Sequence, residues 1–290
     1  MKKILLSMIS CILMILLIVS IISYKCSLSV TPLTNFQPFL TQYSQDSLNK
    51  DIIKENLPTI DASVAFYPLA SKIVENIYSS KNYTNELNWV STAEAYENIV
   101  NGEVDALIVS GPSKEQMELI KNSNKKLKFV PFTKEALIFY VNANNIIDTL
   151  TIEEIQKIYL GKYHEDITTY QLEKNNGSQT CFESIVENNT IDENHIEIKD
   201  MVTIIKSVAY DKNSLAYAFN SFYTKVCNSS KLKLISINGV EPTKENILTE
   251  KYPLLYDIYF VYDEENSNQN LKIIEEWLLS EEGQNFIKNL

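Results

Sequence analysis

Apolar residues along the chain follow two spacings from residue 59 onward. Short apolar runs, typical of strands buried in a sheet, alternate with segments whose apolar residues recur every three or four positions, which is typical of amphipathic helices. Strands are predicted at residues 59–64, 87–91, 104–109, 127–131, 136–141, 215–219, 232–237 and 256–262. Helices are predicted at residues 69–77, 93–100, 114–122, 151–160, 198–209, 271–279 and 282–290, with one more after residue 178. This order predicts an α/β fold.

Alternating strands and helices predict a doubly wound sheet, in which ligands bind at the carboxyl ends of the strands. Polar loops follow predicted strands at residues 61–65, 91–94, 110–113 and 175–180. The apolar run at residues 136–141 is long enough for a strand that passes from one lobe to another. Because the strand–loop–helix arrangement is repeated, an anion site is favoured where these loops meet.

The loop at residues 175–180 is the strongest single candidate for that site. Gly177 is expected to take a positive φ and to let the backbone approach a ligand closely. Ser178 is expected to cap the helix that follows, with Phe182, Ile185 and Val186 on its apolar side. Free N–H groups and the positive end of a helix dipole suit an anion. Taken alone, the same residues also fit an ordinary capped helix.

The N-terminus carries a candidate membrane segment. Lys2 and Lys3 precede an uncharged apolar stretch at residues 4–22, which is long enough to cross a bilayer with its basic flank in the cytoplasm. A cleaved signal peptide and lipid attachment at Cys26 are alternatives, and an uncleaved anchor is favoured over both. We therefore expect a membrane segment at residues 1–26, an extracytoplasmic spacer at residues 27–57, and a location on the outer face of the cytoplasmic membrane.

The net charge and the composition limit which partners, metals and reactions the chain can be expected to have. A formal net charge of −11 disfavours nucleic acid as a partner and requires local dipoles to hold any anion. Cys181 and Cys227 are expected to be independent thiols, although an exported chain permits a disulfide between them. His164 and His195 stand apart from other metal ligands and from Ser178, so we expect no metal, no cofactor and no enzymatic activity.

Several motifs occur together in one order. An Ala-Ser-Val-Ala loop at residues 62–65 precedes Tyr-Pro-Leu-Ala, and Ser-Thr-Ala follows at 91–93. Later motifs lie at residues 104–112, 150–162, 176–182, 215–217, 238–243, 251–254 and 278–284. From residue 59 to the C-terminus this order resembles the phosphate-binding proteins of bacterial ABC importers, which have the type-II periplasmic-binding-protein fold.

The resemblance implies a monomer of two lobes, each a mainly parallel sheet flanked by helices. The first lobe would comprise residues 58–135 and 225–290, and the second residues 136–224. It also implies that a cleft between the lobes binds phosphate or a related oxyanion and passes it to an ABC permease. The ligand-binding positions that it implies are Ser63, Val64, Ala65, Thr92, Ser110, Asn176, Gly177 and Ser178.

Three of the family's ligand positions differ in this chain. Val64 stands where the family has threonine, Ser110 where many members have aspartate, and Leu172 where the family has arginine. Loss of the arginine removes a bidentate charged donor, so we expect weak phosphate binding or a ligand that carries less charge or more donors. The alternative is a membrane-anchored sensor or partner-binding module of the same fold.

Overall fold

The computed structural model describes residues 29–30, 53, 55–78, 86–164, 166–186 and 195–290. The expected membrane segment at residues 1–26 lies outside the described residues, as does most of the expected spacer at 27–57. Within the described ranges, no helix combines the length and the apolar character needed to span a bilayer.

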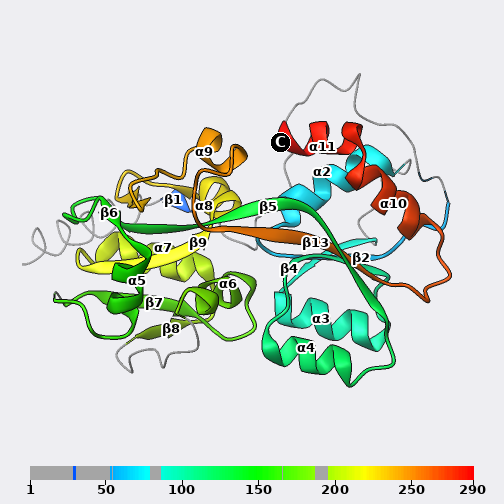
Figure 1. The fold of residues 1–290 in the computed structure, drawn as a ribbon, viewed down its shortest axis with the longest axis horizontal. Coiled ribbons are helices and arrows are strands. Elements are labelled where there is room, and N and C mark those ends of the chain that lie inside the picture. Colours follow the sequence, from blue (N-terminus) through cyan, green and yellow to red (C-terminus); the bar gives the residue numbers. More distant parts are fainter. Residues whose placement is uncertain (1–28, 31–52, 54, 79–85, 165, 187–194) are drawn as a thin grey trace, which may run out of the picture.

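A sheet of nine strands extends through both halves of the molecule (Figure 1). The strands are β1 Ser29–Val30, β2 Ile60–Ser63, β3 Leu87–Val90, β4 Ala106–Ser110, β5 Leu127–Asn142, β6 Thr149–Leu150, β7 Thr168–Leu172, β8 Ile196–Ile198, β9 Ser214–Phe219, β10 Cys227–Asn228, β11 Leu232–Leu234, β12 Ser236–Ile237 and β13 Leu255–Asp263. The order in the large sheet is β3-β2-β4-β13-β5-β9-β7-β8, and β11 also pairs with β5.

Helices cover the sheet on both faces, as an α/β fold requires. They are α2 Tyr67–Ile77, α3 Thr92–Asn101, α4 Lys114–Lys121, α5 Ile152–Tyr159, α6 Gly177–Ile185, α7 Met201–Tyr210, α8 Asn220–Val226, α9 Lys244–Leu248, α10 Asn270–Leu279 and α11 Glu281–Lys288. The predicted α/β class is confirmed, and each helix predicted from the apolar spacing has a counterpart.

Strand β5 joins the two halves of the molecule. Its first part pairs with β13 and its last part, from Leu137, pairs with β9. Two strands had been predicted in this region, but the structure has one of 16 residues. Pro131 lies within it, beside a register shift between Ile258 and Tyr259 of β13. A bulge of this kind tolerates a residue without an N–H donor, so the proline does not end the strand.

The sheet is mixed at its centre, while most strands within each lobe run in the same direction, as expected. β2 is parallel to β3 and β4, and β7 is parallel to β8 and β9. However, β13 is antiparallel to β4 and β5, and β5 is antiparallel to β9. The reason is that β5 and β13 run between the halves in opposite directions, so they place antiparallel pairs in the centre.

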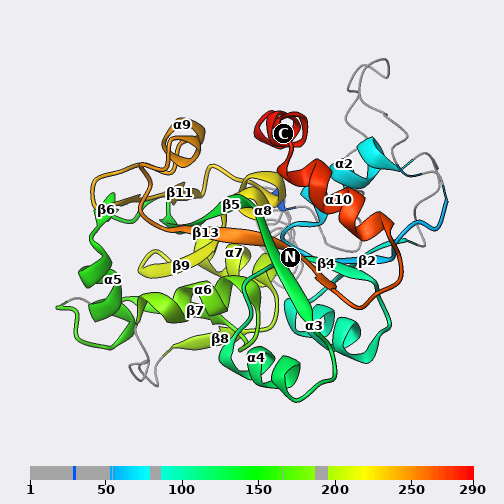
Figure 2. The same ribbon diagram turned by 45° about the vertical axis from the view of Figure 1, so that its right-hand side comes forward.

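We define lobe 1 as residues 55–135 and 255–290, and lobe 2 as residues 136–254. The return to lobe 1 comes later than the boundary predicted at residue 225. Before it returns, the chain adds β11 to the lobe 2 end of β5 and pairs β12 with β6. Both views also place α9 with lobe 2 (Figures 1 and 2).

Two parts of the expected spacer pack against the lobes. Ile53 is buried and forms a bridge with Tyr78 at the end of α2. Strand β1 pairs with β10 in lobe 2. These positions therefore belong to the folded part of the protein.

Lobe 1 shows why its central strand is a continuous apolar run. In β4, Ala106 and Ile108 join the core shared with α2 and α10, whereas Leu107 and Val109 join the core under α3 and α4. Alternate side chains of a strand point to opposite faces. When both faces are covered, as in β4, apolar side chains are favoured at every position. Figure 1 shows α2, α10 and α11 on one face of this sheet and α3 and α4 on the other.

Aromatic packing holds α6 in place within lobe 2. The ring of Phe182 stacks on Tyr217 of β9 with centroids 4.4 Å apart, and it also contacts Tyr159 of α5 at 4.4 Å. All three side chains are buried. As a result, the N-terminus of α6 is fixed at the edge of lobe 2 that faces lobe 1 (Figure 1).

Candidate functional site

Residues from three of the four predicted loops meet across the lobe junction. A Cβ atom placed on Gly177 would overlap the Oγ atom of Ser110 and would lie 3.1 Å from the Oγ1 atom of Thr92. Ser110 ends β4 and Thr92 begins α3, both in lobe 1, whereas Gly177 begins α6 in lobe 2. The Cε2 atom of Phe219 lies 3.5 Å from the same point.

The hydroxyl of Ser110 is buried without a partner at this junction. Its residue is fully buried, and its Oγ atom has no hydrogen bond to any described group. Its main-chain oxygen, in contrast, accepts a 2.8 Å bond from the hydroxyl of Tyr96. Because an unsatisfied buried hydroxyl carries a desolvation cost, such a group at a junction is a candidate ligand contact.

The loop after β2 supplies less donor capacity than its three expected ligand positions suggest. Ser63 is buried, and its carbonyl accepts the N–H of Phe66 at 2.8 Å. The N–H of Val64 donates to the carbonyl of Val90 at 3.0 Å, so it is already engaged. Ala65 is buried directly before α2.

Helix α2 differs from the three other helices that start at this junction. No side chain caps its N-terminus, where Phe66 is the N-cap residue. Helices α3, α4 and α6 are capped by Ser91, Ser113 and Asn176. The start of α2 therefore presents the positive end of its helix dipole without a side-chain cap, although Pro68 in its first turn has no N–H to donate.

The start of α6 corrects two expectations. Its N-cap is Asn176, not Ser178, and the Oδ1 atom of Asn176 accepts both the N–H and the hydroxyl of Ser178 at 3.2 Å. The positive φ lies at Asn175, at 65°, and not at Gly177. Asparagine tolerates this conformation well. Gly177 is therefore needed for the close approach of lobe 1 and not for its φ.

Lobe 1 also bonds directly to Asn175. The hydroxyl of Ser113 donates to its Oδ1 atom at 2.6 Å, and the Nε2 atom of Gln116 donates to its main-chain oxygen at 3.0 Å. In addition, the rings of Phe66 and Phe219 meet across the junction with centroids 4.9 Å apart. Asn175, Gln116 and Phe219 were not among the predicted site residues. The Ser-x-x-Gln pattern at residues 113–116 indicates the capping box of α4 but not its contact with Asn175.

No guanidinium group can reach this junction, since the sequence contains no arginine and its 26 basic residues are all lysines. At the position that the resemblance assigns to arginine, Leu172 is buried and its N–H donates to the Oε1 atom of Gln179 at 3.2 Å. Lys174, close by in sequence, is exposed. The contacts found around Gly177 are therefore made by neutral groups.

A carboxylate missed by the sequence analysis lies where β5 crosses between the lobes. The Oε1 atom of Glu135 accepts the N–H groups of Ala136 at 2.8 Å and Ser221 at 3.4 Å. Burial raises the pKa of Glu135, and the hydrogen bonds from Ser221 and Ala136 oppose this only in part. The charge of Glu135 also adds to the effect of burial in raising the pKa of Cys181 on α6.

The remaining chemistry of the described residues is sparse. Cys181 and Cys227 are both free thiols. Among the residues placed by the structure, no three His, Cys, Asp or Glu side chains gather as a metal site.

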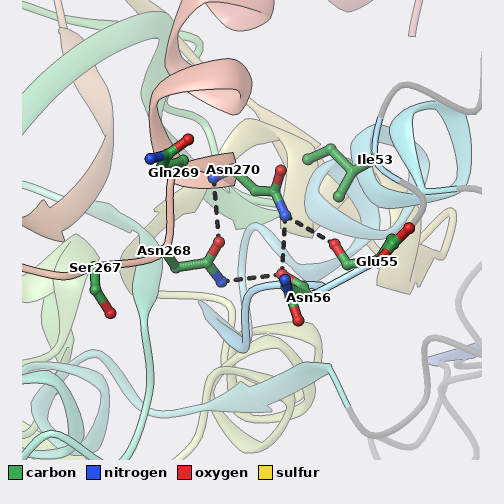
Figure 3. Close-up of a pocket in the computed structure, with 7 residues that line it drawn as sticks. All are labelled: Ile53, Glu55, Asn56, Ser267, Asn268, Gln269 and Asn270. Carbon is green, nitrogen blue, oxygen red and sulfur yellow. Dashed lines mark hydrogen bonds between the residues drawn. The ribbon is translucent and has the colours of Figure 1, made fainter.

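A cavity of about 700 Å³ lies apart from the junction, where residues 55–56 meet the loop before α10 (Figure 3). Its lining residues are Ile53, Glu55, Asn56, Ser267, Asn268, Gln269 and Asn270. The side-chain amide of Asn268 donates to the carbonyl of Asn56 at 3.0 Å, and that of Asn270 donates to the carbonyl of Glu55 at 2.8 Å. These amides are thus used to fasten the two segments together.

Two lobes joined by crossing strands, with helix N-termini that face each other across the junction, define an α/β fold like that of the periplasmic binding proteins. Comparison with known proteins supports this assignment of the fold. The chain belongs to the PBP superfamily domain family, whose model matches residues 56–288.

The chain is a distant relative of PstS-like phosphate-binding proteins. It is 25% identical over 233 residues to the phosphate-binding protein PstS of Staphylococcus saprophyticus, covering 72% of this chain and 71% of the relative. It is 23% identical over 241 residues to the protein SphX of Synechococcus elongatus, covering 75% and 71%. Phosphate-binding proteins such as the PstS relative are binding proteins and not enzymes.

Solved structures show the same fold. A candidate phosphate ABC transporter substrate-binding protein from Clostridium perfringens, with bound phosphate, superimposes with a TM-score of 0.63 at 22% identity, covering 79% of this chain and 95% of that one. An ABC-type phosphate transport receptor from Vibrio cholerae gives 0.60 at 17% identity, covering 80% and 97%. The recognised family and the two-lobed α/β fold are confirmed.

Proposed function

We propose that this chain is a membrane-tethered, extracytoplasmic solute-binding protein that holds phosphate or a related oxyanion between its lobes for an ABC importer. The observation that carries the proposal is the unpartnered, buried hydroxyl of Ser110 beside Thr92 and against Gly177 of the other lobe. Its distant kinship with phosphate-binding proteins supports the same ligand class.

The proposed ligand contacts are neutral donors. Ser110 and Thr92 offer hydroxyls from lobe 1, and the positive end of the α2 helix dipole lies next to Ala65. Gly177 lets α6 come close enough for its N-terminal dipole to face the same point. A ligand that touches both lobes stabilises their closed arrangement, because only differential contacts shift such an equilibrium.

The absence of arginine sets the expected strength of binding. A charged donor contributes roughly 1.5–3 kcal/mol per hydrogen bond, so a site of neutral donors holds a dianion less tightly. We therefore propose a site of modest affinity for phosphate that also accepts oxyanions of lower charge.

The membrane tether is part of the proposal. Residues 4–22 are apolar and uncharged, and Lys2 and Lys3 precede them, which favours an anchor with the lobes outside the cytoplasm. Mass spectrometry of the protein recovered from membranes tests this point. An intact N-terminus supports the anchor, whereas a chain that starts at a lipid-modified Cys26 would replace it by a lipid tether.

Isothermal titration of the full chain in detergent tests the ligand. We expect saturable heat with inorganic phosphate and a clear loss of affinity in the Ser110→Ala variant. Sulfate in a parallel titration shows whether the neutral donors discriminate between oxyanions. If millimolar phosphate and sulfate both give no heat with folded protein, the proposed ligand class is wrong.

A second candidate function rests on two specific observations. Leu172 occupies the arginine position, and Asn175 joins the lobes through direct protein bonds. Both fit a membrane-anchored sensor or partner-binding module of the same fold with little phosphate affinity. Under this function the lobes take their closed arrangement in phosphate-free buffer, and no oxyanion gives heat.

A further inference from the structure

Ser113, the N-cap residue of α4, and Gln116 of the same helix bond directly to Asn175 and so link the two lobes. Ser113 and Gln116 belong to lobe 1 and are both buried, whereas Asn175 belongs to the loop before α6 in lobe 2. Both oxygen atoms of Asn175 accept from lobe 1, the side-chain oxygen from Ser113 and the main-chain oxygen from Gln116. Two bonds to one residue restrain both its position and its orientation.

The backbone of Asn175 is shaped for this contact. Its φ of 65° lies in the left-handed region, where asparagine is one of the few residues tolerated besides glycine. The next residue, Asn176, caps α6, and Gly177 is the first residue of that helix. A bond to Asn175 therefore positions the start of α6 directly.

Gln116 has two tasks at once. Its Oε1 atom accepts the N–H of Ser113 at 2.8 Å and completes the capping box of α4, while its Nε2 atom reaches Asn175. The donors of lobe 1 are thus held in place before the lobes meet. Preorganised groups lose less entropy when a contact forms, so these bonds favour closure efficiently.

We propose that Ser113, Gln116 and Asn175 form a latch that shifts the lobes toward closure independently of any ligand. They are positioning residues, because they act by seating Gly177 against Ser110 and Thr92. The latch does not depend on the identity of the ligand. Each neutral bond has a net effect of about threefold to tenfold on an equilibrium, so removal of one arm should lower the ratio of closed to open molecules by about that factor.

The test measures the distance between the lobes in the full chain, in detergent and in phosphate-free buffer. Nitroxide labels on ketone-bearing residues that replace Glu118 of α4 and Lys157 of α5 report this distance by pulsed electron spin resonance, with all four cysteines left in place. Asn175→Gly removes the side-chain acceptor and retains the left-handed turn. Gln116→Glu retains the capping-box acceptor but turns an oxygen toward the carbonyl of Asn175.

Matched controls are available in lobe 2. Glu154→Gln changes the capping box of α5, which starts with Thr151, and Asn238→Gly changes another asparagine with positive φ. We expect both latch variants to gain a population at longer distance, with the closed-to-open ratio reduced about threefold to tenfold, and both controls to keep the wild-type distribution. Circular dichroism confirms that each variant is folded. Wild-type distances in folded Gln116→Glu, or equal shifts in the controls, overturn the latch.

Discussion

The hydroxyl of Ser110 in lobe 1 occupies the space in which a side chain of Gly177 in lobe 2 would begin. The two lobes therefore approach each other at a point where one of them has no side chain. Glycine is required here by size, since its φ is not positive. The contact also directs a buried hydroxyl without a partner at the N-terminus of α6.

Gly177→Ala should prevent full closure. The added methyl group overlaps Ser110 and crowds Thr92, and overpacking of this kind typically costs about 1–3 kcal/mol. We expect phosphate affinity to fall by about tenfold or more in titration calorimetry. Gly111→Ala is the matched control, because its methyl group would make an ordinary contact with Tyr259 at 3.6 Å. Equal affinities of Gly177→Ala and wild type would contradict this account of the junction.

Ser110→Ala should separate binding from stability. The Oγ atom of Ser110 has no partner, so its removal should leave the free energy of unfolding unchanged or slightly higher while phosphate affinity falls. Ser71→Ala is a control at another fully buried serine, whose hydroxyl donates to the carbonyl of Pro68 at 3.0 Å. That variant should lose about 1 kcal/mol. A similar loss in Ser110→Ala would show that its hydroxyl has a structural partner.

Glu135→Gln should stabilise the fold increasingly as pH rises. Burial raises the pKa of Glu135, and a carboxyl whose pKa is higher in the folded than in the unfolded chain loses stability as it ionises. Urea unfolding should show little difference from wild type at about pH 4, where both states are largely protonated, and a more stable variant at about pH 7. A variant less stable than wild type at neutral pH would mean that the carboxylate is held by favourable interactions.

Glu275→Gln should destabilise the fold at neutral pH, in contrast to Glu135→Gln. Burial acts to raise the pKa of Glu275, but hydrogen bonds from Lys128 at 2.7 and 2.8 Å and from Tyr262 at 2.5 Å outweigh it and lower the pKa. Stability from this group is present above the unfolded pKa and is lost as pH falls through the folded value.

We expect Glu275→Gln to cost roughly 1 kcal/mol at neutral pH in urea unfolding and almost nothing at about pH 3. Glu265→Gln is the control, because the Lys126–Glu265 pair is exposed at 68% and 59% and contributes little. An equal cost in both variants would show that exposure does not set the strength of these pairs.

Local patterns in the sequence were sufficient for most strands and for every helix except α8 and α9, whereas Ser110, Thr92 and Gly177 were expected together from the family resemblance. The reason is that apolar spacing reports burial. The meeting of residues from both lobes depends instead on how β5 and β13 join the lobes. The continuity of β5 through Pro131 was not predictable, because it depends on a register shift in β13, more than a hundred residues later. The partners of Asn175 lie about 60 residues away in sequence, so no local signal connects them.

The predicted N-cap of α6 was wrong for a local reason. Asn176 and Ser178 are both good capping residues, and propensity alone does not separate them. The positive φ of Asn175 decides between them by turning the chain one residue earlier. Glu135 was missed because a single acid in an apolar strand resembles a solvated edge position until its neighbours are known.

The crossing of β5 and β13 has a mechanical consequence. Paired backbone strands resist stretching and sliding but yield to torsion, so relative movement of the lobes should be a rotation about the ribbon that leaves its hydrogen bonds intact. The ribbon leaves lobe 1 where Leu255 pairs with Ala136, so the rotation should be centred there. Small changes of angle there become large displacements at the far ends of both lobes, so a neighbouring membrane protein could distinguish the two poses without contacting the junction itself.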